Sequence, residues 1–175
     1  VETARPYLNE PGAATITPDQ MEGAVWSALI HEARGNAYFQ HNNDNAYGGN
    51  YSIVDIPAVH AKVKAVNAKV QSLAPVLNSQ SYYNTTVVVN GYTYYRFTFS
   101  NGTDTMLKSY NGNAYIFAGL GMGHATGSKT FTLPAGVTGT TVTVVGESCT
   151  IPVSGGQFSD SFAAEYTHHV YQIAL

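Results

Sequence analysis

Glu2 is the residue whose type and position could most directly do chemistry. Its carboxylate follows Val1 and precedes the run Thr3-Ala4-Arg5-Pro6, so it stands at the end of a possible strand stub. A carboxylate can act as a nucleophile, and barrel folds place catalytic groups at the carboxyl ends of their strands. The alternative is a solvated residue near the chain end, because charged side chains are mostly exposed.

Histidine and cysteine raise the question of metal binding. His124 follows a glycine-rich turn, and His168 and His169 are neighbours. Adjacent strand residues point to opposite faces, so this pair cannot chelate one ion together. The single cysteine, Cys149, excludes an internal disulfide and a site of several thiolates, and we expect it to be a buried small hydrophobe. The sequence therefore predicts no metal and no cofactor.

Two helices and a short strand are predicted in the first part of the chain. Thr17 is typical of a helix N-cap, and Gln20 three residues later can close a capping box. The order strand, helix, strand, helix is that of a parallel α/β sheet or barrel. The predicted elements are a strand stub at Val1-Glu2, a helix over Met21–Arg34, a strand over Tyr38–His41 and a helix over Ala58–Leu73.

From Ser81 on, apolar and polar residues alternate and are separated by turn signals. The pairs Asn90-Gly91, Asn111-Gly112 and Gly155-Gly156 favour tight hairpin turns. Short, evenly spaced strands are typical of an antiparallel β-sandwich of immunoglobulin-like size. The predicted strands are Thr85–Val89, Tyr92–Ser100, Thr105–Tyr110, Asn113–Ala118, Thr130–Leu133, Thr141–Val145, Ser148–Pro152 and Ser161–Ile173.

These patterns predict an α+β protein with two domains, residues 1–77 and 78–175. The 175 residues are fewer than those of a complete α/β barrel, which needs roughly 250, so any barrel motif here is a piece of one. Since the first residue is Val1, we expect that upstream residues were removed. The 44% hydrophobic and 11% charged residues exclude a disordered chain.

The composition also indicates which classes of partner the chain could bind. The net charge of −3 and the scattered basic residues leave no electrostatic footprint for nucleic acid. No stretch approaches the ~20 apolar residues of a membrane span. Thirteen tyrosines stand beside many Asn, Thr, Ser and Gly residues, and flat rings beside neutral polar groups suit sugars. The same residues also serve ordinary strands and turns.

Four segments carry a resemblance to a known family: Val1–Pro6, Val25–Gly35, Tyr38–Asn42 and Phe162–Tyr171. Together they resemble the C-terminal part of retaining glycoside hydrolases that have a (β/α)8 barrel followed by a small β-sandwich, a group with many endoglucanases. The resemblance implies a partial barrel remnant of two βα units, followed by an antiparallel immunoglobulin-like β-sandwich. In this resemblance Val1-Glu2 would be the end of the seventh barrel strand, and Tyr38–His41 would be the eighth strand.

The resemblance implies that Glu2 is the nucleophile of a glycoside hydrolase acting on a β-linked polysaccharide such as β-glucan. The partner acid/base of such enzymes is a Glu on the fourth barrel strand, and this sequence lacks that strand. Double displacement needs the two carboxyl groups about 5–5.5 Å apart. The family mechanism is therefore lost unless a second carboxylate comes from Glu10, Glu32, Asp44 or a neighbouring copy.

Around Glu2, the resemblance implies a set of substrate-binding residues that could donate to sugar hydroxyls or stack on a sugar face. The alternative is structural, with an aromatic residue in the core, a histidine capping its strand and a tyrosine lining a loop. The candidate residues are Arg5, Phe39, His41, Asn42 and Tyr47.

A non-catalytic module that binds polysaccharide or supports a barrel is the alternative function. Tyr92 and Tyr94 share one face of a predicted strand and Tyr95 takes the other, so only part of a tyrosine cluster can form a binding platform. The cluster lies in the first part of the predicted sandwich and comprises Tyr82, Tyr83, Tyr92, Tyr94, Tyr95 and Tyr110.

Assembly and location are expected from the same patterns. Two βα units leave apolar surface and strand edges that a whole barrel covers, so we expect a homo-oligomer formed through the helices Met21–Arg34 and Ala58–Leu73. Neutral polar strands and the resemblance suggest a secreted protein. Asn84 and Asn101 each begin an Asn-X-Thr sequence, which matters only in a host that glycosylates.

Overall fold

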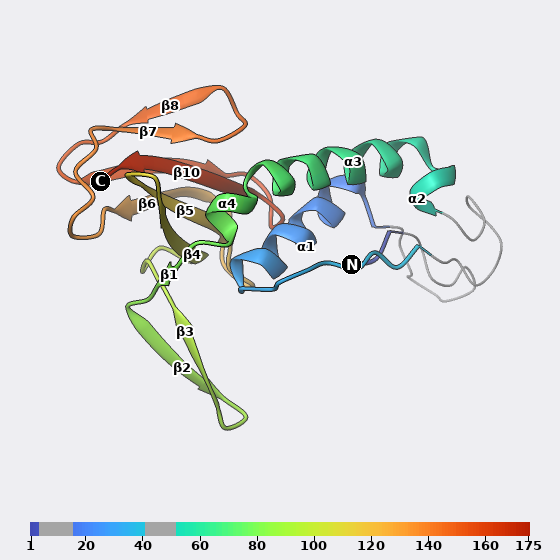
Figure 1. The fold of residues 1–175 in the computed structure, drawn as a ribbon, viewed down its shortest axis with the longest axis horizontal. Helices are drawn as coiled ribbons and strands as arrows, with labels where there is room; N and C mark the ends of the chain where they lie inside the picture. Colours follow the sequence, from blue (N-terminus) through green and yellow to red (C-terminus); the bar gives the residue numbers. More distant parts are fainter. Residues whose placement is uncertain (4–15, 41–51) are drawn as a thin grey trace. The chain divides into compact units, whose positions relative to one another are not determined.

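The computed structural model describes residues 1–3, 16–40 and 52–175. The chain divides into two compact units, of which unit 1 comprises Val1–Leu29 and Ala33–Ser72 and unit 2 comprises Ile30–Glu32 and Leu73–Leu175. Helices dominate unit 1 and antiparallel strands dominate unit 2 (Figure 1). The α+β class is confirmed, whereas the barrel remnant and the immunoglobulin-like sandwich stay predictions.

Helix α1 spans Pro18–Ile30 and begins with the predicted capping box. The Gln20 amide donates to Thr17 Oγ1 over 3.1 Å, and the Thr17 amide donates to Gln20 Oε1 over 2.9 Å. The helix ends four residues before the predicted Arg34, because Glu32 adopts the left-handed region at φ 67°. The Ala33 amide then donates to Ala28 O over 2.9 Å, which closes a Schellman-type end.

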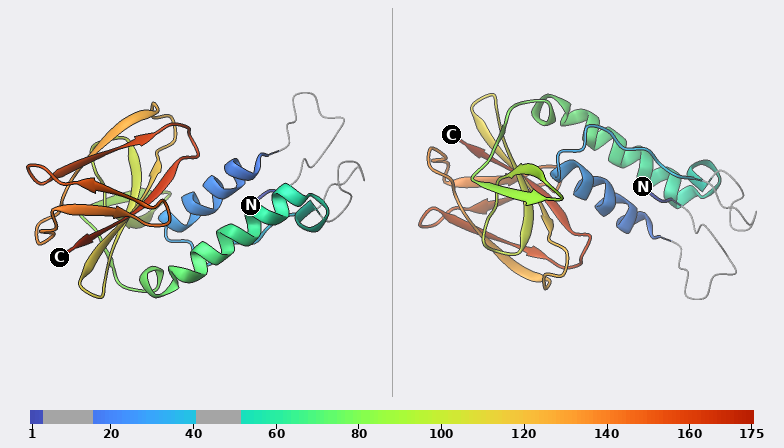
Figure 2. Two further views of the ribbon diagram at one scale, coloured as in Figure 1. Left: turned by 90° about the horizontal axis from the view of Figure 1, so that it is seen from above. Right: turned by 90° about the horizontal axis from the view of Figure 1, so that it is seen from below.

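The remaining helices of unit 1 are α2, Ser52–Asp55, and α3, Pro57–Ser72, which confirms the second predicted helix. Met21 of α1 is buried with Val59 and Val63 of α3. Lys62 of α3 lies 2.8 Å from Asp19 and 2.9 Å from Glu22 of α1. Helices α1 and α3 therefore lie side by side (Figure 2), joined by buried apolar side chains and an ion-pair network.

Unit 2 contains a six-stranded antiparallel sheet in the order β1-β4-β5-β10-β7-β8 and two ribbons, β2-β3 and β6-β9. Strands β4 and β5 are inner strands of this sheet, and their residues are largely buried. The bounds are α4 Ala74–Leu77, β1 Ser81–Tyr82, β2 Thr85–Val89, β3 Tyr92–Arg96, β4 Thr103–Tyr110, β5 Asn113–Leu120, β6 Gly127–Thr132, β7 Thr141–Val144, β8 Cys149–Pro152, β9 Gln157–Phe162 and β10 His168–Ala174.

The core of unit 2 forms where the β6-β9 ribbon packs against the large sheet. Phe131 of β6 stacks on Phe158 of β9 with ring centroids 5.0 Å apart, and Phe158 meets the edge of Tyr171 of β10 at 4.9 Å. Ile116 and Phe162 are fully buried in the same cluster. The aromatic rings thus join the ribbon and the sheet into two layers.

Three sequence expectations in unit 2 are wrong. The strand predicted over Tyr92–Ser100 ends at Arg96, because the backbone leaves the ladder although apolar and polar residues continue to alternate. The segment Ser161–Ile173 is two strands, β9 and β10, separated by a turn in which the Thr167 amide donates to Ala164 O. Cys149 is exposed rather than buried, since it begins the edge strand β8.

Lys108 is a buried charge in unit 2, with a side chain only 1% exposed. Its ammonium donates to Ser81 Oγ over 2.7 Å, to Ser79 O over 3.2 Å and to Glu32 Oε2 over 3.4 Å. An ammonium has three donors, and each has an acceptor here. Burial of this charge is therefore compensated by a complete set of hydrogen bonds.

Candidate functional site

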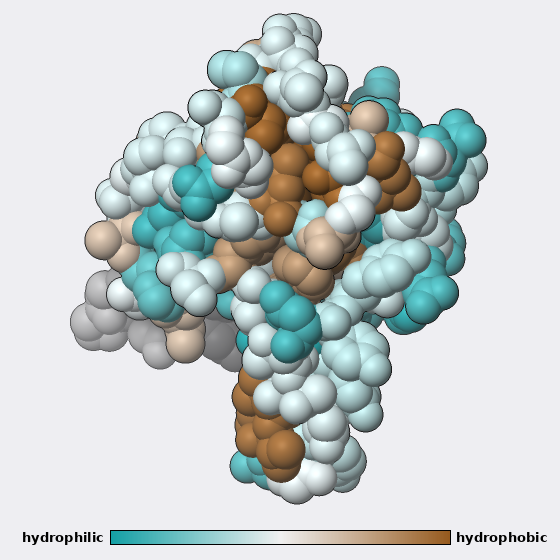
Figure 3. Space-filling view, turned by 90° about the vertical axis from the view of Figure 1, so that its left-hand side faces the viewer, coloured by the Kyte–Doolittle hydropathy of each residue, from teal (hydrophilic) through white to brown (hydrophobic). Residues whose placement is uncertain are grey.

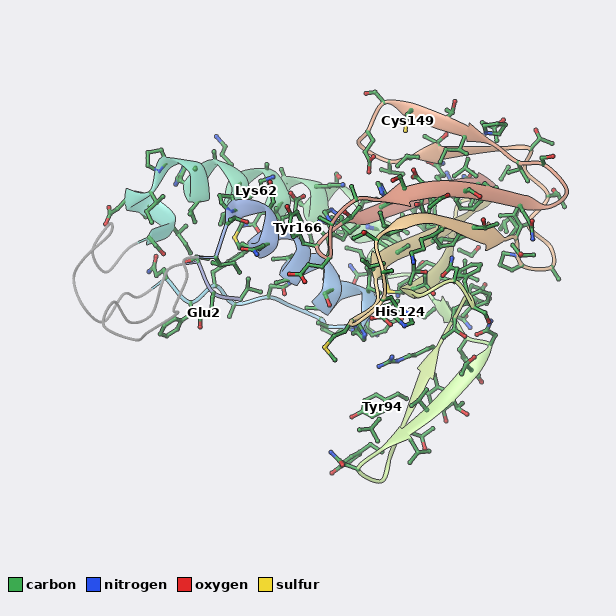
Figure 4. The ribbon with its side chains drawn as sticks, turned by 180° about the vertical axis from the view of Figure 1, so that it is seen from behind. Glu2, Lys62, Tyr94, His124, Cys149 and Tyr166 are labelled. Carbon is green, nitrogen blue, oxygen red and sulfur yellow. The ribbon has the colours of Figure 1, made fainter. Side chains whose placement is uncertain are left out.

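Glu2 lies on a short parallel pairing with Phe39 in unit 1. The Phe39 amide donates to Val1 O over 2.8 Å, and the Thr3 amide donates to Phe39 O over 3.1 Å. Helix α1 lies between the two paired residues in the sequence, which is the order of elements in a βαβ connection. The Glu2 side chain is exposed at this pairing (Figure 4).

Two buried hydroxyl groups anchor the strand stubs next to Glu2. The oxygens of Thr3 Oγ1 and Ser52 Oγ lie 2.8 Å apart. Thr3 Oγ1 also lies 2.9 Å from Phe39 O, and Ser52 Oγ lies 2.9 Å from Gln40 O. Because both hydroxyl residues are almost fully buried, these contacts fix the backbone of Thr3, next to Glu2, and of the paired residues Phe39 and Gln40.

Of the predicted substrate-binding residues, the structure describes Phe39. Its ring is 48% exposed, which contradicts the alternative that placed it in the core and leaves an aromatic ring available beside Glu2. The other four candidates, Arg5, His41, Asn42 and Tyr47, lie outside the described residues.

The source of a second carboxylate was the open question of the predicted mechanism. Glu10 and Asp44 lie outside the described residues. Glu32 belongs to unit 2 and accepts a hydrogen bond from the buried Lys108. Its carboxylate therefore already has a structural role in closing the lysine site.

A polar cluster that the sequence analysis did not single out lies on one face of unit 2. His169 Nδ1 is 2.7 Å from Glu147 Oε1, and His169 Nε2 is 3.2 Å from Ser161 O. Tyr171 donates to Asp160 Oδ2 over 3.2 Å. Burial, followed by the nearby Asp160 carboxylate, raises the pKa of the Tyr171 phenol. The cluster joins β9 and β10 to the turn that holds Glu147.

Near this cluster, neither a reactive thiol nor a metal site is favoured by the described residues. Desolvation and the carboxylates of Glu147 and Asp160 raise the pKa of the Cys149 thiol, and a raised pKa makes a thiol a poor nucleophile at neutral pH. Within residues 1–3, 16–40 and 52–175, no group of three His, Cys, Asp or Glu side chains could hold a metal ion.

His124, the first histidine considered as a ligand, has a packing role. A Cβ atom on Gly102 would come within 2.9 Å of its Nδ1, and one on Gly121 within 3.0 Å of its Cδ2. The histidine ring therefore fits against these two glycines because neither has a side chain.

The tyrosine cluster is on the surface of unit 2. Tyr92 of β3 is 70% exposed, and Tyr83 and Tyr95 have ring centroids 4.9 Å apart. Apolar side chains gather on the β2-β3 ribbon, which carries Tyr94 (Figures 3 and 4). All six tyrosines of the cluster are exposed: Tyr82, Tyr83, Tyr92, Tyr94, Tyr95 and Tyr110.

In the part of the chain that the structure describes, no helix is long and apolar enough to cross a membrane. No protein-family model matches this chain, and no curated protein matches its sequence. Solved structures do match. An α-amylase from Geobacillus thermoleovorans, complexed with acarbose, superposes with a TM-score of 0.53 and 13% identity over 92% of this chain and 34% of its own.

Two further structures are similar. An Anoxybacillus α-amylase has a TM-score of 0.50 and 12% identity, over 89% of this chain and 32% of its own. A GH30 endoxylanase from Clostridium papyrosolvens has a TM-score of 0.48 and 14% identity, over 90% of this chain and 38% of its own. This chain spans about a third of the length of the two α-amylases, and the similarity shows a fold shared with that part of the two α-amylases.

Proposed function

We propose that this chain is part of a glycoside hydrolase in which Glu2 is the nucleophile. The observation that carries the proposal is the parallel pairing of Glu2 with Phe39 across helix α1. Such a βαβ connection is the repeating unit of a (β/α)8 barrel. In this proposal unit 1 is a remnant of two βα units, and unit 2 is an immunoglobulin-like sandwich that supports it.

In the proposed mechanism, the Glu2 carboxylate attacks the anomeric carbon of the bound sugar and forms a glycosyl-enzyme ester. The leaving oxygen takes a proton from a second carboxylic acid, which must lie about 5–5.5 Å from Glu2. That acid would come from Glu10, from Asp44, from a longer form of the chain or from a second copy. Phe39, beside Glu2 and half-exposed, would stack on the sugar.

The remaining predicted contacts complete this proposed site. Arg5 follows the first strand stub in the sequence, and His41, Asn42 and Tyr47 follow the second. In barrel enzymes the loops after the strands form the substrate site. The proposed substrate remains a β-linked glycan such as β-glucan, and starch belongs in the test because two of the similar structures are α-amylases.

The proposal is tested by assaying the purified chain on β-glucan, xylan, mannan and starch. Glu2→Gln keeps the shape of the side chain but removes its nucleophilic charge, so we expect turnover to fall on the order of a thousandfold. Glu165→Gln, at an exposed carboxylate of unit 2, is the matched control and should keep full activity. Equal activity of the two variants would remove Glu2 from the mechanism.

A second candidate function is supported by the exposed tyrosines. In this version unit 2 binds polysaccharide without catalysis, through rings such as Tyr92 and Tyr94 on β3. Affinity electrophoresis in gels containing a soluble glycan tests it. Retention that is lost in Tyr92→Ala and Tyr94→Ala would support the candidate, and migration unaffected by every glycan would defeat it.

Homo-oligomerisation through α1 and α3 is a further part of the proposal. It rests on the sequence expectation that a piece of a barrel lacks neighbours that a whole barrel has. The large apolar side chains of α1 are buried in the described chain, so they offer no exposed apolar face. Light scattering at micromolar concentration tests this point, and a monomeric mass would contradict it.

A further inference from the structure

A groove opens in unit 2 where β3 leaves its ladder. The Asn84 amide donates to Arg96 O over 3.0 Å, and beyond Arg96 the backbone of Phe97 instead accepts the hydroxyl of Thr105. This departure leaves a cavity of about 390 Å³ between the Phe97–Asn101 segment and strand β6. A volume of this size falls in the range of small-ligand sites, about 300–1,000 Å³.

Aromatic rings line one side of the groove. Phe97 and Phe99 lie with ring centroids 5.3 Å apart, and Phe99 meets the buried Phe131 edge-on at 5.2 Å. Both rings are partly buried against the core of unit 2, so their positions are fixed by packing. Pro134 adds a further apolar surface to the same lining.

Asn84 supplies a rigidly held amide at one end. Its Oδ1 accepts the Thr98 amide over 2.9 Å, and its Nδ2 donates to Thr98 O over 3.0 Å. The side chain thus pairs with the Thr98 backbone as a neighbouring strand would. An asparagine amide has two N–H donors, and its hydrogen bond to Thr98 O uses one of them.

Asn101 supplies a second fixed amide. Its Nδ2 donates to Thr130 O over 2.9 Å, while its Oδ1 accepts from Thr103 Oγ1 over 2.7 Å and from the Thr103 amide over 3.1 Å. Among the described residues these bonds use one of the two Asn101 side-chain N–H groups, as at Asn84. They also fix the orientation of the Asn101 amide.

The rest of the lining is neutral. Hydroxyl groups come from Thr98, Ser100, Thr130 and Thr132. Three of them already contact the side chains of Thr85, Ser159 and Gln157, and a hydroxyl can both donate and accept. The described lining contains no charged side chain. Fixed aromatic rings, amide donors and hydroxyls without charge match a ligand that has an apolar face and neutral hydroxyls around its edge.

We propose that this groove binds a neutral glycan, one or two sugar units at a time, with Phe97 and Phe99 against a sugar face and Asn84 and Asn101 donating to its hydroxyls. The choice of a glycan rests on the proposed glycoside hydrolase function, although the groove uses no residue of the Glu2 site. It would hold a polysaccharide near the chain independently of catalysis.

Nuclear magnetic resonance titration of the isotope-labelled chain tests the proposal. The probes are the hexamers of β-1,4-glucose, xylose, mannose and α-1,4-glucose, with an acidic galacturonate hexamer as the charged comparison. The side-chain amide signals of Asn84 and Asn101 and the backbone signals of Thr98 and Ser100 should shift with at least one neutral hexamer. The charged hexamer should shift them less.

Two variants that each replace an aromatic ring with leucine separate this groove from the tyrosine cluster. Phe99→Leu removes a ring but keeps apolar packing, and it should weaken binding about tenfold, as expected for one lost ring contact. Tyr92→Leu removes an exposed ring of β3 outside the groove and should leave the affinity unchanged. Retention of the native amide spectrum shows that each variant is folded.

Failure of this inference can be distinguished from failure of the proposed catalysis. Glu2→Gln should bind the hexamer as the unchanged chain does, whatever its effect on turnover. The groove proposal is overturned if none of the neutral hexamers shifts the Asn84 and Asn101 amides. It is also overturned if Tyr92→Leu, rather than Phe99→Leu, weakens binding.

Discussion

Thr17 and Gln20 show how two side chains fix the start of a helix. The side-chain oxygen of each residue accepts a hydrogen bond from the backbone amide of the other. The Gln20 amide donates over 3.1 Å and the Thr17 amide over 2.9 Å. The first amides of a helix have no partner inside the helix, so this exchange satisfies them reciprocally. The pair was predictable from the sequence because it depends on four consecutive residues alone.

Removal of this cap should destabilise unit 1. We expect Thr17→Ala to lower the free energy of unfolding by about 1 kcal/mol, because the Gln20 amide loses its acceptor. Thr17→Ser keeps the hydroxyl and should stay within a few tenths of the original value. Urea unfolding followed by Trp26 fluorescence is a direct measurement, since Trp26 lies on α1 and is the only tryptophan. Equal midpoints for Ala and Ser would contradict the cap.

Tyr171 gives unit 2 a dependence on alkaline pH. Burial and the Asp160 carboxylate raise its pKa above the ordinary value of 10.0. The unfolded chain therefore loses this proton at a lower pH than the folded chain. Stability from the group is fully present below pH 10 and declines above it, by about 1.4 kcal/mol per pH unit.

The loss of stability caused by Tyr171→Phe should become smaller as the pH rises. At pH 7 the variant should be less stable by about 1–3 kcal/mol, because Asp160 loses a donor. Above pH 10 the difference should shrink, since phenylalanine has no proton to lose. Urea unfolding followed by circular dichroism at pH 7, 10 and 11 measures both effects, and a difference that stays constant over this range would disprove the assignment.

Among the elements, the hairpin β4-β5 depends on its Asn-Gly turn. Asn111 and Gly112 have φ values of 49° and 74°, as a two-residue turn of type I′ requires. The same geometry joins β2 to β3 at Asn90 and Gly91, with φ values of 50° and 80°. The two turns therefore have one local geometry but differ in surroundings.

An alanine in each turn separates local strain from global stability. Gly112→Ala should destabilise unit 2 by about 1–2 kcal/mol, because an L side chain is strained at positive φ and β4 and β5 are buried inner strands of the large sheet. Gly91→Ala has the same strain in an exposed ribbon, and it should change the global unfolding free energy by less than about 0.5 kcal/mol. A larger loss at Gly91 would show that β2-β3 is part of the cooperative core.

Strand ends were harder to predict than turns. Phe97 and Phe99 continue the alternating pattern of β3, so the sequence predicted a strand up to Ser100. The ladder nevertheless ends at Arg96, because Phe97 O accepts the Thr105 hydroxyl and Asn84 takes the place of a strand beside Thr98. These contacts join residues far apart in the chain, which periodicity does not register.

The candidate sites differ in the same way. Glu2 could be singled out because a strand stub and a carboxylate are adjacent in the sequence, whereas the groove is assembled from three separate segments. Asn84 and Asn101 are marked in the sequence only as the first residues of Asn-X-Thr sequences. That pattern is unrelated to the hydrogen bonds of their side-chain amides. The prediction that Cys149 is buried is wrong because the residue lies on the edge strand β8. The position of a strand within its sheet cannot be predicted from a single cysteine.

At the scale of the whole molecule, unit 2 contains its own hydrophobic core. Its strands β1 to β10 pair with one another. We expect residues 73–175 expressed alone to unfold cooperatively on heating. This fragment omits Glu32, which is 3.4 Å from Lys108, so it should be less stable than unit 2 in the full chain. Circular dichroism melting provides the test, and a fragment without a cooperative transition would show that residues 73–175 are not a domain.

The central claim is that the Glu2 carboxylate is a nucleophile toward a sugar. Dinitrophenyl glycosides test it without requiring an acid, because their leaving group departs without protonation. In a chain that has no second carboxylate to act as the base, hydrolysis of the ester is slow, so a glycosyl adduct should accumulate. Mass spectrometry should locate one glycosyl group on the peptide containing Glu2, and Glu2→Gln should form none. An adduct on another residue, an adduct that persists in Glu2→Gln, or no adduct with any glycoside would contradict the claim.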